Sequence, residues 1–180
     1  VDAADIQETD GYKYGRQVYQ DEKYRVIDFK GIEVFKNVSH IHFACALVNG
    51  ERGYVKNFKY LSTLKIDSIG ITFSDRNYNL NQLKGLKYIS FVACENFNLK
   101  FDKKSKVESI RLLDSKGKVD VSNLKTLKTF SSYETIFKKI KFGKNAKLKK
   151  LSIDGSAYCI NKKIRKLDIS KMKNLRYLYL

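Results

Sequence analysis

One six-residue template, L-x-x-L-x-L, recurs along the chain and constrains its fold more than any other feature. It occurs as LKYISF at 86–91, LKTFSS at 127–132, LKKLSI at 148–153 and LRYLYL at 175–180, and only Ser132 breaks it. When any apolar residue may replace Leu, three more copies appear: Val38/Ile41/Phe43, Leu61/Leu64/Ile66 and Val107/Ile110/Leu112. The middle positions, spaced by 23, 25, 21, 20, 21 and 27 residues, are Ile41, Leu64, Ile89, Ile110, Phe130, Leu151 and Leu178. This period predicts a solenoid with one coil per repeat.

Each template has the alternation of a β-strand. Its last two apolar positions are two residues apart, so both side chains point to one face while the residue between them points to the other. A further apolar residue stands six positions before each template: Ile32, Val55, Leu80, Phe101, Val121, Phe142 and Ile169. We therefore expect a β-rich, α/β-type solenoid with a parallel sheet on its concave face and short irregular or 3₁₀ return segments.

Two segments, KVDVSNLKTLKTFSS and KLDISKMKNLRYLYL, resemble bacterial surface or secreted members of the leucine-rich-repeat family. The resemblance implies a leucine-rich-repeat coil of about seven repeats that works as a binding module, secreted or at the cell surface. The chain departs from the family pattern at the usual Asn position, three residues after the template, where it has Ala46, Ile69, Cys94, Ser115 and Ser156.

Residues 1–30 do not fit the template, and we expect them to form an N-terminal cap before a solenoid at 31–180. The cap has a strand-like segment, KYRVIDF, at 23–29. The other end stops on a predicted strand at Leu180, so we expect further coils or a partner to cover that edge. No run approaches the roughly 18–20 apolar residues of a membrane-spanning helix, and no targeting peptide is recognisable in this chain.

The residues between the inward positions should form columns on the concave face. They include aromatic and charged side chains of the kind that make interfaces, although a merely solvated face is the alternative. The candidate binding residues are His40, His42, Lys65, Asp67, Tyr88, Arg111, Tyr133, Lys150, Tyr177 and Tyr179. The expected partner is a protein or a surface polymer rather than a nucleic acid.

Besides a binding module, an enzyme built around His40 and His42 is a hypothesis, because the two side chains share one face of a strand. A metal site is disfavoured because Lys65 should lie beside them in the next coil. A hydrolase would need Ser39 or Ser62 as nucleophile, with Asp67 to orient a histidine. No phosphate-binding loop or metal motif occurs. We therefore predict no catalytic residue, metal or cofactor.

Charge is distributed unevenly along the chain. The formal net charge is +17, but residues 1–34 carry eight acidic and five basic side chains, which leaves 31 minus 11, or +20, for the rest. Lysine can serve solubility and prevent edge aggregation, or it can bind an anionic partner. The best polyanion candidates lie in the basic stretch 138–176: Lys147, Lys149, Lys150 and Arg176. Adjacent coils should align Lys149 with Arg176 and Lys147 with Asn174.

The three cysteines, Cys45, Cys94 and Cys159, are odd in number and widely spaced. This is not the pattern of a disulfide scaffold or a zinc cluster. Cys45 and Cys94 should lie about two coils apart, roughly 9–10 Å at the spacing of parallel strands. A disulfide needs Cα atoms within about 7 Å, so we predict three free thiols.

Overall fold

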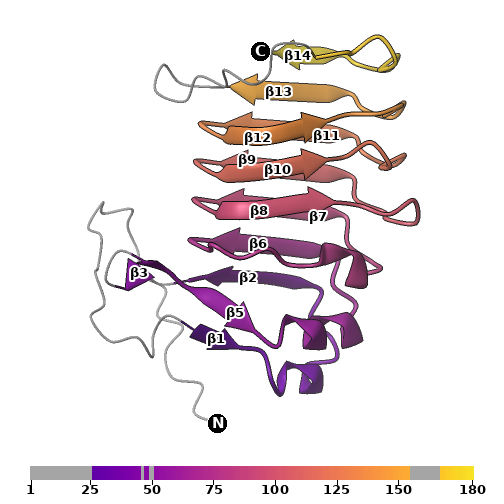
Figure 1. Cartoon of the computed structure of the whole chain (residues 1–180). Helices are drawn as coiled ribbons and strands as arrows, with labels where there is room; N and C mark the ends of the chain where they lie inside the picture. Colours follow the sequence, from indigo (N-terminus) through magenta and orange to yellow (C-terminus); the bar gives the residue numbers. More distant parts are fainter. Residues whose placement is uncertain (1–25, 46, 49–50, 155–166) are drawn as a thin grey trace.

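The chain is a parallel β-solenoid of about four turns with almost no helix. This computed structural model describes residues 26–45, 47–48, 51–154 and 167–180. Seven strands stack one above another in a single parallel sheet (Figure 1). They are β2 (His40–Ala44), β6 (Ser68–Thr72), β7 (Tyr88–Val92), β9 (Ser109–Leu113), β11 (Thr129–Tyr133), β13 (Lys150–Asp154) and β14 (Tyr177–Tyr179).

The template explains why these segments are strands. In β9, for example, Ile110 and Leu112 are fully buried while the side chains between and beside them face outward. One inward column runs through the whole sheet and consists of Ile41, Ile69, Ile89, Ile110, Phe130, Leu151 and Leu178. From Ile69 to Leu151 its members are spaced by 20, 21, 20 and 21 residues, which are the four regular turns. The predicted parallel sheet is confirmed.

The predicted second copy of the template is wrong by five residues. Ile69, and not Leu64, aligns with Ile41 and Ile89. Leu61 lies in the 3₁₀ helix η3 (Phe58–Thr63), and Leu64 follows that helix. Both residues are buried, because η3 packs its apolar side on the same core. The error arose because Ile66, Ile69 and Ile71 match the relaxed template as well as Leu61, Leu64 and Ile66 do.

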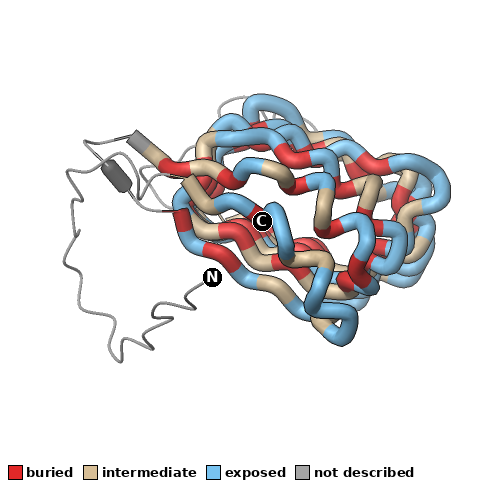
Figure 2. Tube along the Cα trace, turned by 90° about the horizontal axis from the view of Figure 1, so that it is seen from below, coloured by how far each residue is buried: buried red, intermediate tan, exposed pale blue. Residues whose placement is uncertain are grey.

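The return segments differ from the prediction in three coils. Strands β8 (Glu95–Lys100), β10 (Lys116–Asp120) and β12 (Ile136–Lys141) form a second parallel sheet in the order β12-β10-β8. Their inward residues Phe97, Val119 and Phe137 are buried, so this sheet closes the core from the other side. Seen from below, the coils superimpose as a flattened ring in which buried and exposed residues alternate (Figure 2).

Short 3₁₀ returns occur only near the start of the described solenoid. They are η2 (Ile32–Val34), η3 and η4 (Leu80–Gln82). The remaining strands there are β1 (Val26–Asp28), which pairs in parallel with β5 (Tyr54–Lys56), and β3 (Leu47–Val48), which pairs antiparallel with β4 (Glu51–Arg52). No α-helix occurs in the described ranges, so the β-rich expectation holds there and the α/β-type expectation does not.

A ladder of small polar side chains stands at the corner where the Asn column was expected. It consists of Ser74, Cys94, Ser115 and Thr135, all buried. The Cys94 N–H donates to Ser115 Oγ (3.0 Å), and Ser115 Oγ donates to the Leu113 carbonyl (2.7 Å). Each ladder residue follows one with positive φ: Phe73, Ala93, Asp114 and Glu134. Hydroxyls and a thiol thus satisfy backbone groups that the tight corner leaves unpaired.

The predicted positions at this corner and at the cap have separate outcomes. Ile69 was assigned to this corner only because the second copy of the template was misaligned, and it is an inward strand residue. Ala46 and Ser156 lie outside the described residues. Strand β1 falls within the strand-like segment at 23–29. Residues 1–25 lie outside the described ranges, so the cap stays a prediction. None of the helices described is long and apolar enough to cross a membrane.

Candidate functional site

The outer face of the seven-stranded sheet presents three columns of side chains in register. The first is His40, Ser68, Tyr88, Ser109, Thr129, Lys150 and Tyr177; the second is His42, Gly70, Ser90, Arg111, Ser131, Ser152 and Tyr179; the third is Ala44, Thr72, Val92, Leu113, Tyr133 and Asp154. These columns match the prediction in every coil except the second. We call this surface the tyrosine face.

Two predicted binding residues do not lie on the tyrosine face. Lys65 is exposed in the segment between η3 and β6. The position beside His42 that the sequence predicted for Lys65 is occupied by Gly70. Asp67 precedes β6, where its N–H donates to the Ser39 carbonyl (2.8 Å) at the corner by which the coil enters the sheet. Both errors follow from the misaligned second template.

Four tyrosines stand out from this face. Tyr88, Tyr133, Tyr177 and Tyr179 are 46%, 48%, 67% and 59% exposed. The Glu134 carboxylate raises the pKa of Tyr133, with smaller contributions from partial burial, Asp154 and Tyr179. Between Tyr88 on β7 and the other three on β11 and β14, the face carries mainly small hydroxyl side chains and the exposed Arg111. Val92 and Leu113 add an apolar patch in the third column, next to Tyr133.

The two histidines are held by different neighbours. Ser39 Oγ is hydrogen-bonded to His40 Nδ1 (2.8 Å), and His40 Nε2 lies 3.4 Å from Asp67 Oδ1. His42 Nε2 is hydrogen-bonded to Thr72 Oγ1 (3.0 Å). Within the described ranges, no group of three or more His, Cys, Asp or Glu side chains is arranged to hold a metal ion.

The structure brings Ser39, His40 and Asp67 together, and it separates Ser62 from them. The Ser62 hydroxyl instead donates to the Lys59 carbonyl (2.7 Å). The His40 side chain is 71% exposed, although the Asp67 Oδ1 that faces it is buried. The imidazole is therefore open to water, whereas a hydrolytic triad needs a site that excludes water and offers donors for an oxyanion. The geometry favours a surface polar cluster at the end of the sheet.

A hollow of about 440 Å³ lies elsewhere, between residues 77–81 and β8. Most of its asparagine side chains are already hydrogen-bonded to the backbone. Asn77 Oδ1 accepts from the Asn98 N–H (3.1 Å), while Asn81 accepts from the Asp102 N–H and donates to the Lys100 carbonyl (both 3.0 Å). They complete the hydrogen bonding of the edge strand β8. The alternating asparagines of NYNLN (77–81) and NFN (96–98) could have signalled this role.

Three of the predicted polyanion residues, Lys147, Lys149 and Arg176, lie at one corner of the solenoid, whereas Lys150 lies on the tyrosine face. The Arg176 N–H donates to the Lys149 carbonyl (2.8 Å), and Lys150 pairs with Tyr177, so the expected alignment of Lys149 with Arg176 is confirmed. Preceding coils of this corner column carry Asp67, Lys87, Glu108 and Lys128, which alternate in sign. Lys128 Nζ lies 2.6 Å from Glu108 Oε2.

Cys45 and Cys94 are buried free thiols, as predicted, and Cys159 lies outside the described residues. Burial raises the pKa of Cys45 from 9.0 to about 12 and that of Cys94 from 9.0 to about 11. The neutral thiol is therefore the stable form of each residue in the folded chain.

Because the folded state holds these protons more tightly than the unfolded state, their contribution to stability is complete below pH 9 and declines as the pH rises toward 11–12. Between pH 8 and pH 10.5 we expect each thiol to lower the free energy of unfolding by about 2 kcal/mol. Urea unfolding at several pH values would measure this, with the Cys94→Ser variant as comparison. Equal pH dependence in the two proteins would contradict it.

No protein-family model, curated protein or solved structure matches the chain.

Proposed function

We propose that the chain is a binding module that recognises a protein through the tyrosine face. The observation that carries this proposal is the set of exposed tyrosines around a strip of small hydroxyls with Arg111 near its centre. Tyrosine and arginine are the residues most often found at the energetic centre of protein interfaces. Tyrosine also loses little conformational entropy when it binds, since it has only two side-chain torsions.

The backbone geometry supports the same conclusion. Six of the seven strands that carry this face have a buried residue on their inward side, so the backbone that carries the outward side chains is held in place before a partner arrives. A preorganised surface loses less free energy on binding than a surface that must become ordered. We assign no chemistry to the Ser39, His40 and Asp67 trio, because its exposure supports a binding surface better than a catalytic centre.

We further propose that the solenoid is a leucine-rich-repeat coil of about seven repeats. The support is the template itself, whose first and middle positions, such as Leu127 and Phe130, are buried in the regular coils. The hydroxyl and thiol ladder would then replace the family's Asn ladder, and β8, β10 and β12 would be extended versions of its short returns. Secretion by a bacterium, or display at its surface, rests on the resemblance of the repeats alone.

The test compares wild type with the variant Tyr88→Ala/Arg111→Ala/Tyr177→Ala in binding to proteins extracted from the source organism's surroundings. The triple variant should bind a specific partner at least tenfold more weakly than wild type does, because each central aromatic residue or arginine contributes about 1 kcal/mol or more to the binding free energy. A control variant, Lys84→Ala/Lys125→Ala, changes exposed residues away from the face and should bind as wild type does. Undiminished recovery by the triple variant would reject the tyrosine face.

A further inference from the structure

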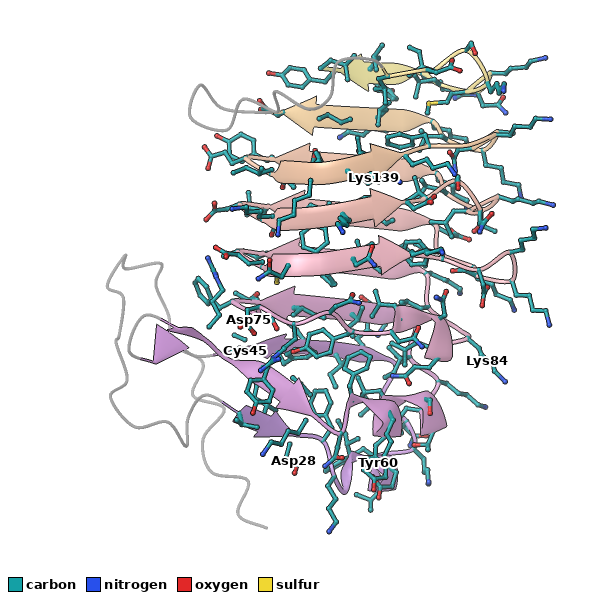
Figure 3. The ribbon with its side chains drawn as sticks, viewed as in Figure 1. Asp28, Cys45, Tyr60, Asp75, Lys84 and Lys139 are labelled. Atoms are coloured by element: carbon teal, nitrogen blue, oxygen red, sulfur yellow. The ribbon has the colours of Figure 1, made fainter. Side chains whose placement is uncertain are left out.

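The outer face of the three-stranded sheet has a different chemistry from the tyrosine face. Three rows cross it in register: Glu95, Lys116 and Ile136; Asn98, Lys118 and Lys139; and Lys100, Asp120 and Lys141. Lys138, at an irregularity of β12, donates from Nζ to Asn96 Oδ1 on β8 (2.9 Å). We call this surface the lysine face; Figure 3 shows Lys139 on it.

Positive charge on the lysine face exceeds negative charge, and each of its two carboxylates already has a cation. Glu95 Oε1 lies 3.2 Å from Arg52 Nη2, and Asp120 Oδ2 lies 3.9 Å from Lys141 Nζ. Among the described residues, Lys116, Lys118 and Lys139 have no carboxylate within ion-pairing distance. Unpaired ammonium groups therefore dominate the middle of the sheet.

The arrangement costs free energy in the unliganded protein. Lys118 and Lys139 are direct cross-strand partners, on strands about 4.8 Å apart, and like charges placed so are destabilising. The corner column alternates in sign from Asp67 to Lys128 and becomes wholly basic only at its end, where Lys149 and Arg176 follow. Like-charged neighbours in the middle of a sheet are therefore not required for solubility. An anion that bound across the strands would remove the repulsion.

The composition of the lysine face limits which anion fits. It has no aromatic side chain on which a base could stack, and it has no helix to enter a duplex groove. Its cations are lysines, which act as point charges on phosphate, whereas arginine would be needed for bidentate recognition. These features disfavour nucleic acid and favour a polyanion without bases.

Neighbouring lysines favour a flexible chain over a flat lipid surface. Lys84 projects from the corner of the solenoid beside the lysine face, as Figure 3 shows, and Lys125 and Lys147 occupy corner segments of later coils. A planar membrane cannot contact the sheet and this corner at once, whereas a polymer can bend from one to the other. We propose that the lysine face binds a flexible, base-free phosphate polymer that lies across β8, β10 and β12.

The experiment titrates salt against the affinity for long-chain inorganic polyphosphate. If about five lysines each release a counterion, the log–log slope should be about −4, and affinity should fall by two to three orders of magnitude between 50 and 200 mM salt. The variant Lys116→Gln/Lys118→Gln/Lys139→Gln should flatten the slope by about 2. Circular dichroism would confirm that its fold is intact.

A control with the same change in charge, Lys30→Gln/Lys36→Gln/Lys59→Gln, alters exposed positions in the first coils, outside the lysine face and the corner lysines beside it. It should keep a slope within about 1 of wild type. Equal flattening in both variants would show binding to net charge and overturn the proposal. Tighter binding of oligo-dT than of polyphosphate at equal charge would assign the face to nucleic acid instead. Preferential binding of phosphatidylserine vesicles would assign it to a membrane.

Discussion

Replacing Phe130 by alanine should lower the free energy of unfolding by about 3–5 kcal/mol. Phe130 is 0% exposed on β11 and packs against Phe137 and Phe142, with ring centroids 6.2 and 5.2 Å away. It therefore joins the two sheets in the middle of the solenoid, and neighbouring coils on both sides prevent the cavity from collapsing. Urea denaturation followed by circular dichroism would measure the loss.

Tyr133→Ala is the matched control for Phe130→Ala. It removes an aromatic ring from the same strand, three residues later, but from the exposed outer face. The expected change is within about 0.5 kcal/mol, as for most surface substitutions. Equal losses in the two variants would mean that β11 does not present alternate residues to core and solvent.

Asn145→Leu should cost about 3–5 kcal/mol even though it adds an apolar residue to a buried site. Asn145 is 0% exposed, and its Nδ2 donates to the carbonyls of Val121 and Leu124, both at 2.9 Å. Its Oδ1 accepts from the Gly143 N–H (2.8 Å). Leucine would leave the Leu124 carbonyl and the Gly143 N–H without partners, while the Val121 carbonyl would keep the Leu124 N–H. Each unpartnered group costs about 1–3 kcal/mol when it is buried. Thermal and urea unfolding would both report the loss.

Asn123→Leu provides the comparison for that variant. Asn123 is only half-buried, and its Nδ2 donates to the Phe101 carbonyl (2.9 Å). Both residues line the hollow beside β8, from which water could replace the amide. We expect a loss of about 1 kcal/mol. If Asn145→Leu were no more destabilising than Asn123→Leu, the buried amide would not be holding adjacent coils together.

The regular coils could be predicted from sequence because their strands carry two signals at once. Ile89, Ile110 and Leu151 each stand in a template and at a spacing of 20 or 21 residues from a neighbouring template. In the second coil the template matches at two places, Leu61/Leu64/Ile66 and Ile66/Ile69/Ile71. The residue chosen there, Leu64, is buried like Ile69, so hydrophobicity cannot distinguish them.

The second sheet and the buried polar residues had weaker signals. Strands β8, β10 and β12 are interrupted by Asn96, Gly117 and Lys138, which sit at irregularities of register. An apolar alternation broken in this way does not resemble a continuous strand. Asn145 and Ser115 are polar residues in the core, and only their backbone partners explain them.

Of the candidate site, the columns of the tyrosine face were predictable and the lysine face was not. Sequence order identified Tyr88, Arg111 and Tyr177 as outward residues because they lie within templates. Lys118 and Lys139 lie in return segments, and their adjacency depends on pairing between strands that the template does not describe. Sequence order instead groups the C-terminal lysines, which are close together along the chain.

The parallel sheet of the solenoid passes through Ile69. Nuclear Overhauser effects between backbone protons of a uniformly labelled sample would show this, since adjacent parallel strands lie about 4.8 Å apart. We expect contacts from Ile69 to both Ile41 and Ile89 and from Ile110 to both Ile89 and Phe130. Contacts that join Leu64 to Ile41 and Ile89, with none from Ile69, would contradict it.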